Sequence, residues 1–307
     1  MKAGEAAARG VSPGPAAPGP GGSEGSTEKN QSRVEDNQRR LQRFWDSSRD
    51  YYRQAAEANV ELTADRRVLL GYLEGGERLL DLGCGSCENA LWLPAGCRYL
   101  GFDVSTSALV MADEQGRPGR RLRGDGAGLP LADESFDAVL STYALEHFHD
   151  PGATFYEAAR VLRPGGLLLF VGSAWDLPYE MPPSLDPGRQ KEVAARRLGR
   201  QLAAWLTGRH AFDTVPEPRV LTDGYVPDAD AVHVAQSWQL ARYLKAMGME
   251  LLEHRSLPHR AEPAGLRALY RRLLRWVPLW SRAWGNTLLV ARRGEELRPV
   301  PYRLLPL

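Results

Sequence analysis

The sequence predicts an α/β protein with a doubly wound, mainly parallel sheet that is covered by helices on both faces. From about residue 78 to residue 172, apolar runs of strand length alternate with runs of helical periodicity. Each parallel pair of strands needs a crossover connection, so this alternation favours a parallel sheet. The run GGLLLFVG at 165–172 has no polar alternation, as expected of a strand buried on both faces.

The amino-terminal part of the chain divides into a tail and the start of a single domain. Residues 1–32 are rich in Pro, Gly and Ser and have too few large apolar side chains to offset the entropy of ordering, so we expect a disordered tail. Residues 33–307 are expected to form one domain. Charged and apolar residues at helical spacing predict an amphipathic helix or two over 34–58 and a short helix over 63–72.

The later elements follow in a regular order, interrupted by two insertions. The expected strands are 78–83, 98–104, 121–125, 136–142, 165–172 and 286–293. The expected helices between them are 89–93, 107–115 and 155–162, and residues 237–257 are expected to form a helix followed by a strand. Residues 173–234 are too long for a plain connection and suggest a lid or substrate cap around one helix, 188–209. A second insertion, 258–285, precedes the final expected strand.

Composition and charge exclude several classes of protein. The chain has 307 residues, is 43% hydrophobic and carries a net charge of +1, so no overall field attracts nucleic acid, and we expect no such partner. Cys84, Cys87 and Cys97 are too few and odd in number for a disulfide framework. The single C-x-x-C has no second pair to complete a zinc site, and we expect no metal. With neither a signal-peptide pattern nor a membrane-length apolar run, we expect a cytoplasmic protein.

The first functional motif is RLLDLGCGSCENALWL, residues 78–93, in which Asp81 precedes glycines 83 and 85. Glycines at a strand-to-helix turn let the backbone approach a ligand closely. A carboxylate beside that turn would repel a pyrophosphate, whereas it would attract an ammonium or a sulfonium. The spacing also fails the G-x-G-x-x-G pattern, because Glu88 holds the third position. The motif therefore argues against a nicotinamide-dependent oxidoreductase.

Two further acids follow the next two expected strands. Asp103 ends the strand YLGFDV, where a carboxylate can accept hydrogen bonds from both hydroxyls of a ribose. Asp125 in RGDGAGLPL can accept from an adenine amine, while the backbone of Gly126 and Ala127 reads the ring edge. The three acids together predict a ligand made of adenosine and a cationic amino acid. Each acid alone could instead cap a helix, end a strand or form an Asx-turn.

The segments LLDLGCG, GFDVS, GDGAGLPLADESFDAVLSTYALEH and EAARVLRPGGLLLF resemble, in order and spacing, the motifs of class I S-adenosylmethionine-dependent methyltransferases. This resemblance implies a Rossmann-like sheet of seven strands and S-adenosylmethionine as cofactor. The implied cofactor-binding residues are Asp81, Gly83, Cys84 and Gly85 for the methionine end, Asp103 and Val104 near the ribose, Asp125, Gly126 and Ala127 for adenine, and Tyr143. Where relatives usually have a third glycine, this chain has Cys87.

The methyl acceptor is less constrained by sequence. Methyl transfer is an in-line displacement, so a general base is needed only if the acceptor atom loses a proton. STYALEHFHD follows the fourth expected strand, and Tyr143, Glu146 and His147 are the catalytic candidates; a packed or surface role for His147 is the alternative. Asp228 and Asp230 in the first insertion, near His233, are expected to cap loops, with acceptor contact as the alternative.

The sequence therefore predicts a methyltransferase that acts on a small-molecule or lipid- or glycan-linked acceptor, with oxygen as the preferred atom. The alternatives are a carbon acceptor, as in quinone biosynthesis, a nitrogen acceptor, and a non-catalytic protein that binds S-adenosylmethionine. In 264–284 an arginine stripe of Arg267, Arg271 and Arg275 flanks an apolar face, and no acid occurs. Such a segment can contact the inner membrane surface peripherally, or it can cover the sheet edge with its arginines solvated.

Overall fold

The computed structural model describes residues 36, 38–58, 61–215, 217–218, 226–258, 269, 273, 276–277, 280 and 285–307. The tail expected at 1–32 lies outside the described residues. Most of the second insertion lies outside them too, including the three arginines of the expected stripe. Within the described residues, every helix is too short or too polar to cross a lipid bilayer.

The main sheet has seven strands in the order β3-β2-β1-β4-β5-β9-β8. The strands are β1 (Arg78–Leu82), β2 (Arg98–Asp103), β3 (Arg120–Arg123), β4 (Phe136–Thr142), β5 (Leu162–Ser173), β8 (Met249–Pro258) and β9 (Gly285–Arg293). All neighbours from β3 to β5 pair in parallel, whereas β9 is antiparallel to both β5 and β8. The predicted doubly wound, mainly parallel sheet of seven strands is confirmed.

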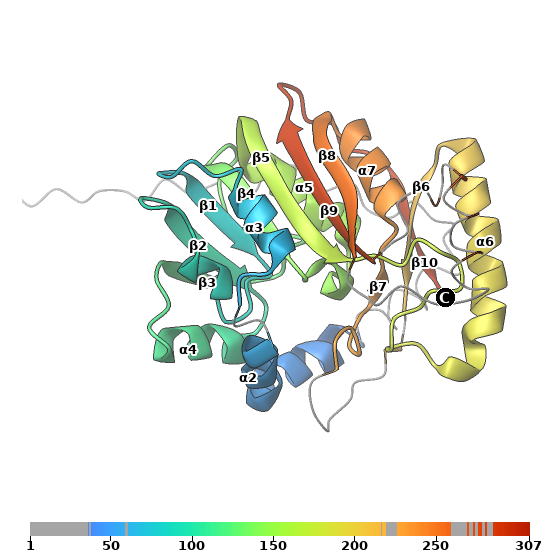
Figure 1. Ribbon diagram of the computed structural model, residues 1–307, viewed down its shortest axis with the longest axis horizontal. Coiled ribbons are helices and arrows are strands. Elements are labelled where there is room, and N and C mark those ends of the chain that lie inside the picture. Colours follow the sequence, from blue (N-terminus) through green and yellow to red (C-terminus); the bar gives the residue numbers. More distant parts are fainter. Residues whose placement is uncertain are drawn as a thin grey trace, which may run out of the picture.

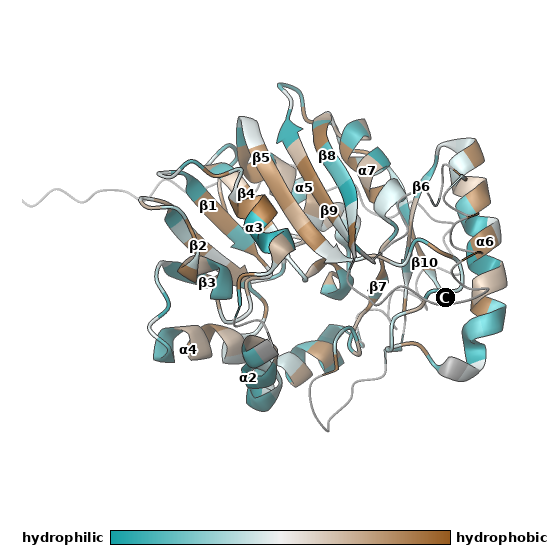
Figure 2. Cartoon of the chain, viewed as in Figure 1, coloured by the Kyte–Doolittle hydropathy of each residue, from teal (hydrophilic) through white to brown (hydrophobic). Residues whose placement is uncertain are grey.

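Side-chain alternation along the strands divides the core into two layers, one on each face of the sheet. In β5, Leu168 and Phe170 pack into the layer with α5 (Pro151–Val161) and α7 (Ser237–Ala246). Leu169 and Val171 pack into the opposite layer, with α3 (Ala64–Leu70) and α4 (Thr106–Glu114). Figures 1 and 2 show β5 in the middle of this arrangement, apolar along most of its length. The run GGLLLFVG is thus buried on both faces, as its composition predicted.

Helices α4 and α5 each begin at a side chain that satisfies a free backbone N–H group. The Ser105 hydroxyl accepts from the amide of Ala108 at the start of α4, and the Asp150 carboxylate accepts from the amide of Ala153 at the start of α5. The helix expected after the glycine turn is shorter than predicted, a single 3-10 turn at Glu88–Leu91. Before the sheet, residues 38–47 are helical and α2 (Arg49–Ala58) follows, as the amphipathic spacing predicted.

A second sheet of three strands, in the order β10-β6-β7, was not predicted. Its strands are β6 (His210–Thr214), β7 (His233–Val234) and β10 (Tyr302–Pro306). Two of these strands come from the first insertion and the third from the chain end, so the pairing depends on contacts distant in sequence. No strand is predicted after residue 293, because the residues of β10 show no alternation of apolar and polar side chains. The first insertion thus contributes two strands of this sheet and α6 (Gln190–Thr207) at the side of the molecule (Figure 1).

A buried ion pair joins α6 to the small sheet. The Arg197 side chain is fully buried and lies 3.3 Å from the Asp213 carboxylate of β6. The same guanidinium donates to backbone carbonyls, including that of Leu177 at 3.2 Å. Because the charge and its donors all have partners, this arginine can be buried without an unpaired charge.

The carboxyl ends of β1, β2 and β4 meet at one edge of the main sheet. From β1 the chain order runs through β2 and β3 in one direction, and through β4 and β5 in the other. This reversal is the topological switch point, where parallel sheets leave a crevice for ligands. In Figure 1, α2 lies across this edge of the sheet.

Candidate active site at the switch point

A cavity of about 570 Å³ lies beyond the carboxyl ends of β1, β2 and β4. Its walls come from the glycine turn after β1, from the end of β2, and from the 3-10 turn η2 (Leu145–His147) after β4. The amino-terminal helices contribute Trp45, Tyr51 and Tyr52, and the first insertion contributes Pro227, Asp228 and Asp230. Segments far apart in the sequence thus enclose one continuous space.

The glycine turn has the backbone shape that its sequence requires. Gly83 has φ +73°, and a Cβ there would lie 2.4 Å from the Cβ of Ala144. Gly85 has φ +53°, and a Cβ there would meet no atom within 4 Å, so this part of the backbone borders open space. Cys87 also has a left-handed conformation, φ 61°, which costs a non-glycine residue about 1–2 kcal/mol. A glycine would adopt this conformation without that cost.

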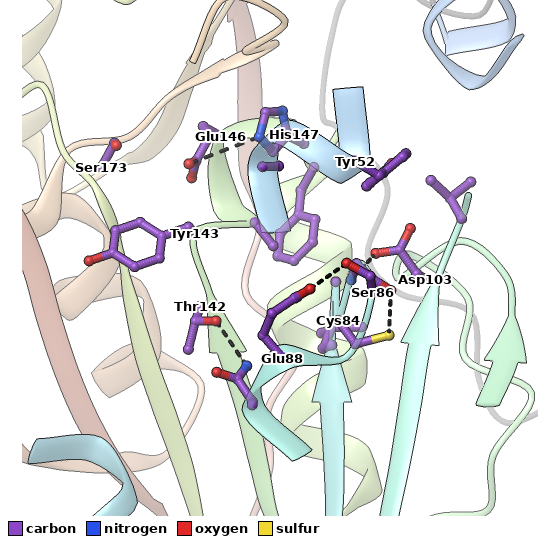
Figure 3. A pocket seen from close by; sticks show the side chains of 18 of the residues that line it. Tyr52, Cys84, Ser86, Glu88, Asp103, Thr142, Tyr143, Glu146, His147 and Ser173 are labelled. Carbon is purple, nitrogen blue, oxygen red and sulfur yellow. Dashed lines mark hydrogen bonds and ion pairs between the residues drawn. The ribbon is translucent and has the colours of Figure 1, made fainter. Parts of the chain in front are cut away.

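Asp103 closes the end of β2 and faces the cavity (Figure 3). One carboxylate oxygen accepts from the amide of Gly85 at 2.8 Å, and the other accepts from the amide of Ser105 at 2.8 Å. Burial raises the pKa of this carboxyl, although the backbone hydrogen bonds oppose the shift. Each oxygen keeps acceptor capacity for a hydroxyl group. Val104, the next residue, also lines the cavity.

Asp81 lies beneath the glycine turn and is not among the residues that line the cavity. Its fully buried carboxylate accepts from the Tyr99 hydroxyl at 2.7 Å and from the Asn89 amide nitrogen at 3.1 Å. Burial raises its pKa to about 6. The structure therefore places this acid behind the turn, where it orients Asn89, rather than at the cavity surface where the sequence expected it.

Asn89 was missed by the sequence reading. Its amide nitrogen donates to Asp81 and, at 3.0 Å, to the Thr142 hydroxyl. An ionised carboxylate can only accept hydrogen bonds, so the amide nitrogen of Asn89, and not its oxygen, must face Asp81. This requirement fixes the orientation of the amide. The Asn89 Oδ1 atom is buried and has no hydrogen-bond partner within the described part of the chain, although the residue lines the cavity. A buried acceptor without a donor favours a ligand that brings one.

Arg66 was missed as well. This arginine of α3 is buried, lines the cavity, and places its guanidinium over the rings of Trp92, at 5.7 Å, and Tyr143, at 5.6 Å. It brings a positive charge to the part of the cavity near the glycine turn and the Asn89 amide. No sequence signal distinguishes it from Arg67, which is exposed.

The third predicted acid, Asp125, is exposed at the rim of the cavity. Its carboxylate accepts from the amide of Ala127 at 2.9 Å, which is the Asx-turn considered as an alternative. Gly126 lines the cavity, and a Cβ there would lie 3.0 Å from the Thr154 methyl carbon. Ala127 is not among the lining residues.

The opposite end of the cavity is acidic. Glu146 is buried, and its carboxylate lies 4.0 Å from Nε2 of His147 (Figure 3). The Asp230 carboxylate lies 3.5 Å from Nδ1 of the same ring. Burial, together with the nearby Asp228 carboxylate, raises the pKa of Glu146 to about 8. Burial alone would lower the pKa of His147, but the surrounding carboxylates, Asp230 first, raise it above its ordinary value.

The first insertion is tied to this acidic end by direct hydrogen bonds. Asp230 accepts from the Trp45 indole nitrogen at 2.7 Å and from the Tyr51 hydroxyl at 3.2 Å. Asp228, with φ 63°, accepts from the Ser173 hydroxyl at 3.1 Å. Both aspartates line the cavity, whereas His233 is buried in β7 and does not.

Tyr143 lines the cavity between its two ends, but its hydroxyl is already engaged. It donates to the Asp65 carboxylate and accepts from the Asn286 amide nitrogen at 3.0 Å. Burial and the hydrogen bond to Asp65 raise its pKa well above the ordinary value. Such a group remains protonated at neutral pH and does not act as a general base.

Comparisons with known proteins agree with this geometry. Residues 80–170, from β1 to β5, match the model of a family described as a methyltransferase domain. These residues form a methyltransferase domain of the class I, S-adenosylmethionine-dependent type. Its cofactor is S-adenosylmethionine.

Similar proteins differ in the acceptor that their names give. A malonyl-[acyl-carrier protein] O-methyltransferase of Yersinia pestis is 35% identical over 40% of this chain and 50% of its own length. A demethylmenaquinone methyltransferase of Corynebacterium glutamicum (strain R) is 39% identical over 31% of this chain and 41% of its own. The chain thus spans about half or less of the length of these curated relatives.

Among solved structures, an S-adenosylmethionine-dependent methyltransferase from Mesorhizobium loti is 22% identical, with a TM-score of 0.46, over 75% of this chain and 98% of that one. A likeness at that score adds nothing to the topology described above.

The described residues fit an S-adenosyl amino acid. Open space borders the Gly85 backbone, the Asp103 carboxylate offers two acceptors to a ribose, and the Asn89 Oδ1 atom lacks a donor that an ammonium would supply. Arg66 provides a cation for the carboxylate of the same amino acid. A ligand with these four features matches the methyltransferase cofactor better than it matches a dinucleotide.

Proposed function

We propose that this methyltransferase transfers a methyl group to a hydroxyl oxygen of an uncharged or cationic acceptor, either a small molecule or a lipid- or glycan-linked group. The observation that carries this proposal is that one continuous cavity joins the glycine turn and Asp103 to the pair of Glu146 and His147. The cofactor, when bound, supplies a methyl group activated by a sulfonium. The acceptor then occupies the acidic end.

The residues near the glycine turn would hold the cofactor. Asp103 would accept from the ribose hydroxyls, and the Gly126 backbone would border the base. Asn89 Oδ1 would accept from the ammonium and Arg66 would pair with the carboxylate. Trp45 and Tyr52 of the amino-terminal helices would cover this part of the cavity and exclude water.

The charges at the other end select the acceptor. Glu146, Asp228 and Asp230 gather around His147, and no arginine or lysine is found among the described residues that line that end. A carboxylate or phosphate placed there would be repelled, and burial strengthens the repulsion because the local dielectric constant is low. A hydroxyl can instead donate to one of these acceptors. This charge distribution favours a neutral or cationic acceptor.

The proton of the acceptor hydroxyl would go to the pair of His147 and Glu146. The Asp230 carboxylate, 3.5 Å from Nδ1, stabilises the protonated form of His147, so the ring can take a proton as the new O–C bond forms. Asp230 positions the ring and is itself held by Trp45 and Tyr51. Tyr143 would shape the cavity without taking part in proton transfer.

A carbon acceptor of the quinone type is the second candidate, because a relative's name, demethylmenaquinone methyltransferase, points to that chemistry. Carbon methylation also requires loss of a proton, so the pair of His147 and Glu146 would serve it in the same way. The two candidates differ in the product, a methyl ether or a methylated ring carbon.

The test is a transfer assay with S-adenosylmethionine labelled in the methyl group and matched pairs of acceptors. Each pair has the same carbon skeleton with either a hydroxyl or a carboxylate, for instance a phenol and the corresponding benzoic acid. We expect transfer to hydroxyl acceptors only, and NMR of the product should show a methyl ether. Preferential labelling of the carboxylates would refute the proposed acceptor class, and a methylated ring carbon would favour the second candidate.

A further inference from the structure

Two cysteines lie in contact beside the cofactor end of the cavity. Cys84 and Cys87 are buried free thiols, and their sulfur atoms are 3.5 Å apart. The amide of Cys87 donates to the carbonyl of Cys84 at 2.9 Å, so the two residues begin and end one turn of the backbone. The first and last Cα atoms of such a turn are within about 7 Å of each other, which overlaps the roughly 4.4–6.8 Å that a disulfide spans. A disulfide between them therefore requires only a local movement.

The strand beside this turn has no side chain where the two sulfurs lie. A Cβ on Gly101 of β2 would be 2.9 Å from each sulfur, so the thiols fill the space that a side chain there would occupy. The hydrogen bond between them lowers the pKa of Cys87, whereas burial raises the pKa of Cys84 well above its ordinary value. Cys87 is thus the first of the two to lose its proton, and the resulting thiolate lies beside the Cys84 thiol.

The two sulfurs differ in their access to the cavity. Cys84 lines it (Figure 3), whereas Cys87 is fully buried and is not among the lining residues. A small oxidant that enters the cavity when no cofactor fills it therefore meets Cys84 first. Cys87 lies directly behind, in the position of a second thiol that can complete a disulfide.

We propose that Cys84 and Cys87 are a modification site at which hydrogen peroxide forms a reversible disulfide, and that this disulfide weakens cofactor binding. The Cys84 sulfur attacks a peroxide oxygen, its proton passes to the Cys87 thiolate, and the O–O bond breaks to release hydroxide. Cys84 is then a sulfenic acid. The Cys87 sulfur attacks the Cys84 sulfur, the S–S bond forms, and the hydroxyl group leaves as water with the Cys87 proton. The two sulfurs lose two electrons, which the peroxide takes up.

The disulfide would disturb the turn at a cofactor contact. Gly85 lies between the two cysteines, and its amide donates at 2.8 Å to Asp103, the residue assigned to the ribose hydroxyls. Drawing the sulfurs from 3.5 Å to about 2 Å moves the backbone that carries this amide and borders the cavity. We expect the affinity for the cofactor to fall by about tenfold or more, the factor that corresponds to one lost hydrogen bond to a charged group.

The first experiment identifies the bond by mass spectrometry. The tryptic peptide 79–98 also contains Cys97, which is partly buried and donates to Glu77 at 3.2 Å, so the full chain is used with Cys97→Ser to leave only the pair. The reduced protein is treated with hydrogen peroxide and then alkylated. We expect this peptide to lose two hydrogen atoms and to carry no alkyl group, and dithiothreitol should restore two alkylated thiols. Two alkylated thiols after peroxide, or disulfides between chains only, would overturn the proposal.

The second experiment measures the affinity for S-adenosylhomocysteine by calorimetry before and after peroxide. Oxidation should weaken binding by about tenfold or more, and dithiothreitol should restore it. Cys87→Gly is the matched variant, because glycine readily adopts the left-handed conformation of this position, φ 61°, and its affinity should not respond to peroxide. Circular dichroism checks that the variant is folded, and Cys84→Ser tests the other sulfur in the same way. An equal loss of affinity in these variants would overturn the proposal.

The route of the oxidant is tested with the cofactor product present. S-Adenosylhomocysteine should slow disulfide formation, because it fills the space from which Cys84 is reached. Equal rates with and without it would contradict attack through the cavity. None of these readouts needs a methyl acceptor, so their outcome is independent of the proposed acceptor class.

Discussion

The substitution Glu146→Gln should make the protein more stable at high pH and should do so by an amount that depends on pH. Burial and the Asp228 carboxylate raise the pKa of Glu146 from an ordinary 4.5 to about 8. Between these two pKa values, from pH 4.5 to about pH 8, the unfolded chain releases the Glu146 proton while the folded protein retains it. Wild-type stability is therefore lost as pH rises from about 5 to 8. Glutamine has a similar shape and cannot ionise, so the variant avoids this loss.

The size of the effect follows from the shift. A rise in pKa from 4.5 to about 8 corresponds to roughly 5 kcal/mol of folding free energy, and this is an upper value because His147 shares the charge. We expect the stability of the variant relative to wild type to grow by a few kcal/mol between pH 5 and pH 8, and then to level off.

Urea denaturation of both proteins at intervals from pH 5 to pH 9 measures this difference. Glu77→Gln is a control of opposite sign, because hydrogen bonds from the amides of Glu74 and Gly75 outweigh burial and lower the pKa of Glu77. Its carboxylate stabilises the fold above its unfolded pKa, so that variant should lose stability at neutral pH. A constant stability difference between Glu146→Gln and wild type from pH 5 to pH 9 would refute the assignment of a buried, protonated Glu146.

The other predictions concern binding and rate. Asp103→Ala should weaken S-adenosylhomocysteine by about 1.5–3 kcal/mol in calorimetry, the range for lost hydrogen bonds to a charged group, and unchanged affinity would exclude the ribose contact. Arg66→Met should weaken S-adenosylhomocysteine but not adenosine, which lacks the carboxylate; equal losses for both ligands would contradict the pairing. His147→Asn should lower kcat on the order of 10²- to 10⁴-fold. In wild type, kcat should rise with pH through a pKa above 6.5, and a flat profile would argue against a base.

The elements that depend on local periodicity and strand order were predictable from sequence. The alternation of strands and helices, the glycine turn and the position of Asp103 at the end of β2 all follow from short segments. Asp103 is the last residue of β2, and the carboxyl ends of the parallel strands meet at the switch point, so its position in the cavity wall was predictable.

The features that sequence did not reveal depend on contacts distant in the chain. Asp81 turns away from the cavity because Tyr99 and Asn89 bind it, and neither contact has a motif. Arg66 and Arg67 are adjacent and alike, and it is Arg66 that packs against the rings of Trp92 and Tyr143. The small sheet pairs β6 with β10, nearly ninety residues later in sequence, so no local pattern indicates it.

The central claim is that the cavity at the switch point binds an S-adenosyl nucleoside. Isothermal titration calorimetry of the full chain with S-adenosylhomocysteine, beside a parallel titration with NAD, tests this claim most directly. We expect saturable binding of one S-adenosylhomocysteine per chain and none of NAD. Absence of S-adenosylhomocysteine binding by the folded protein, or binding of NAD in its place, would contradict the account.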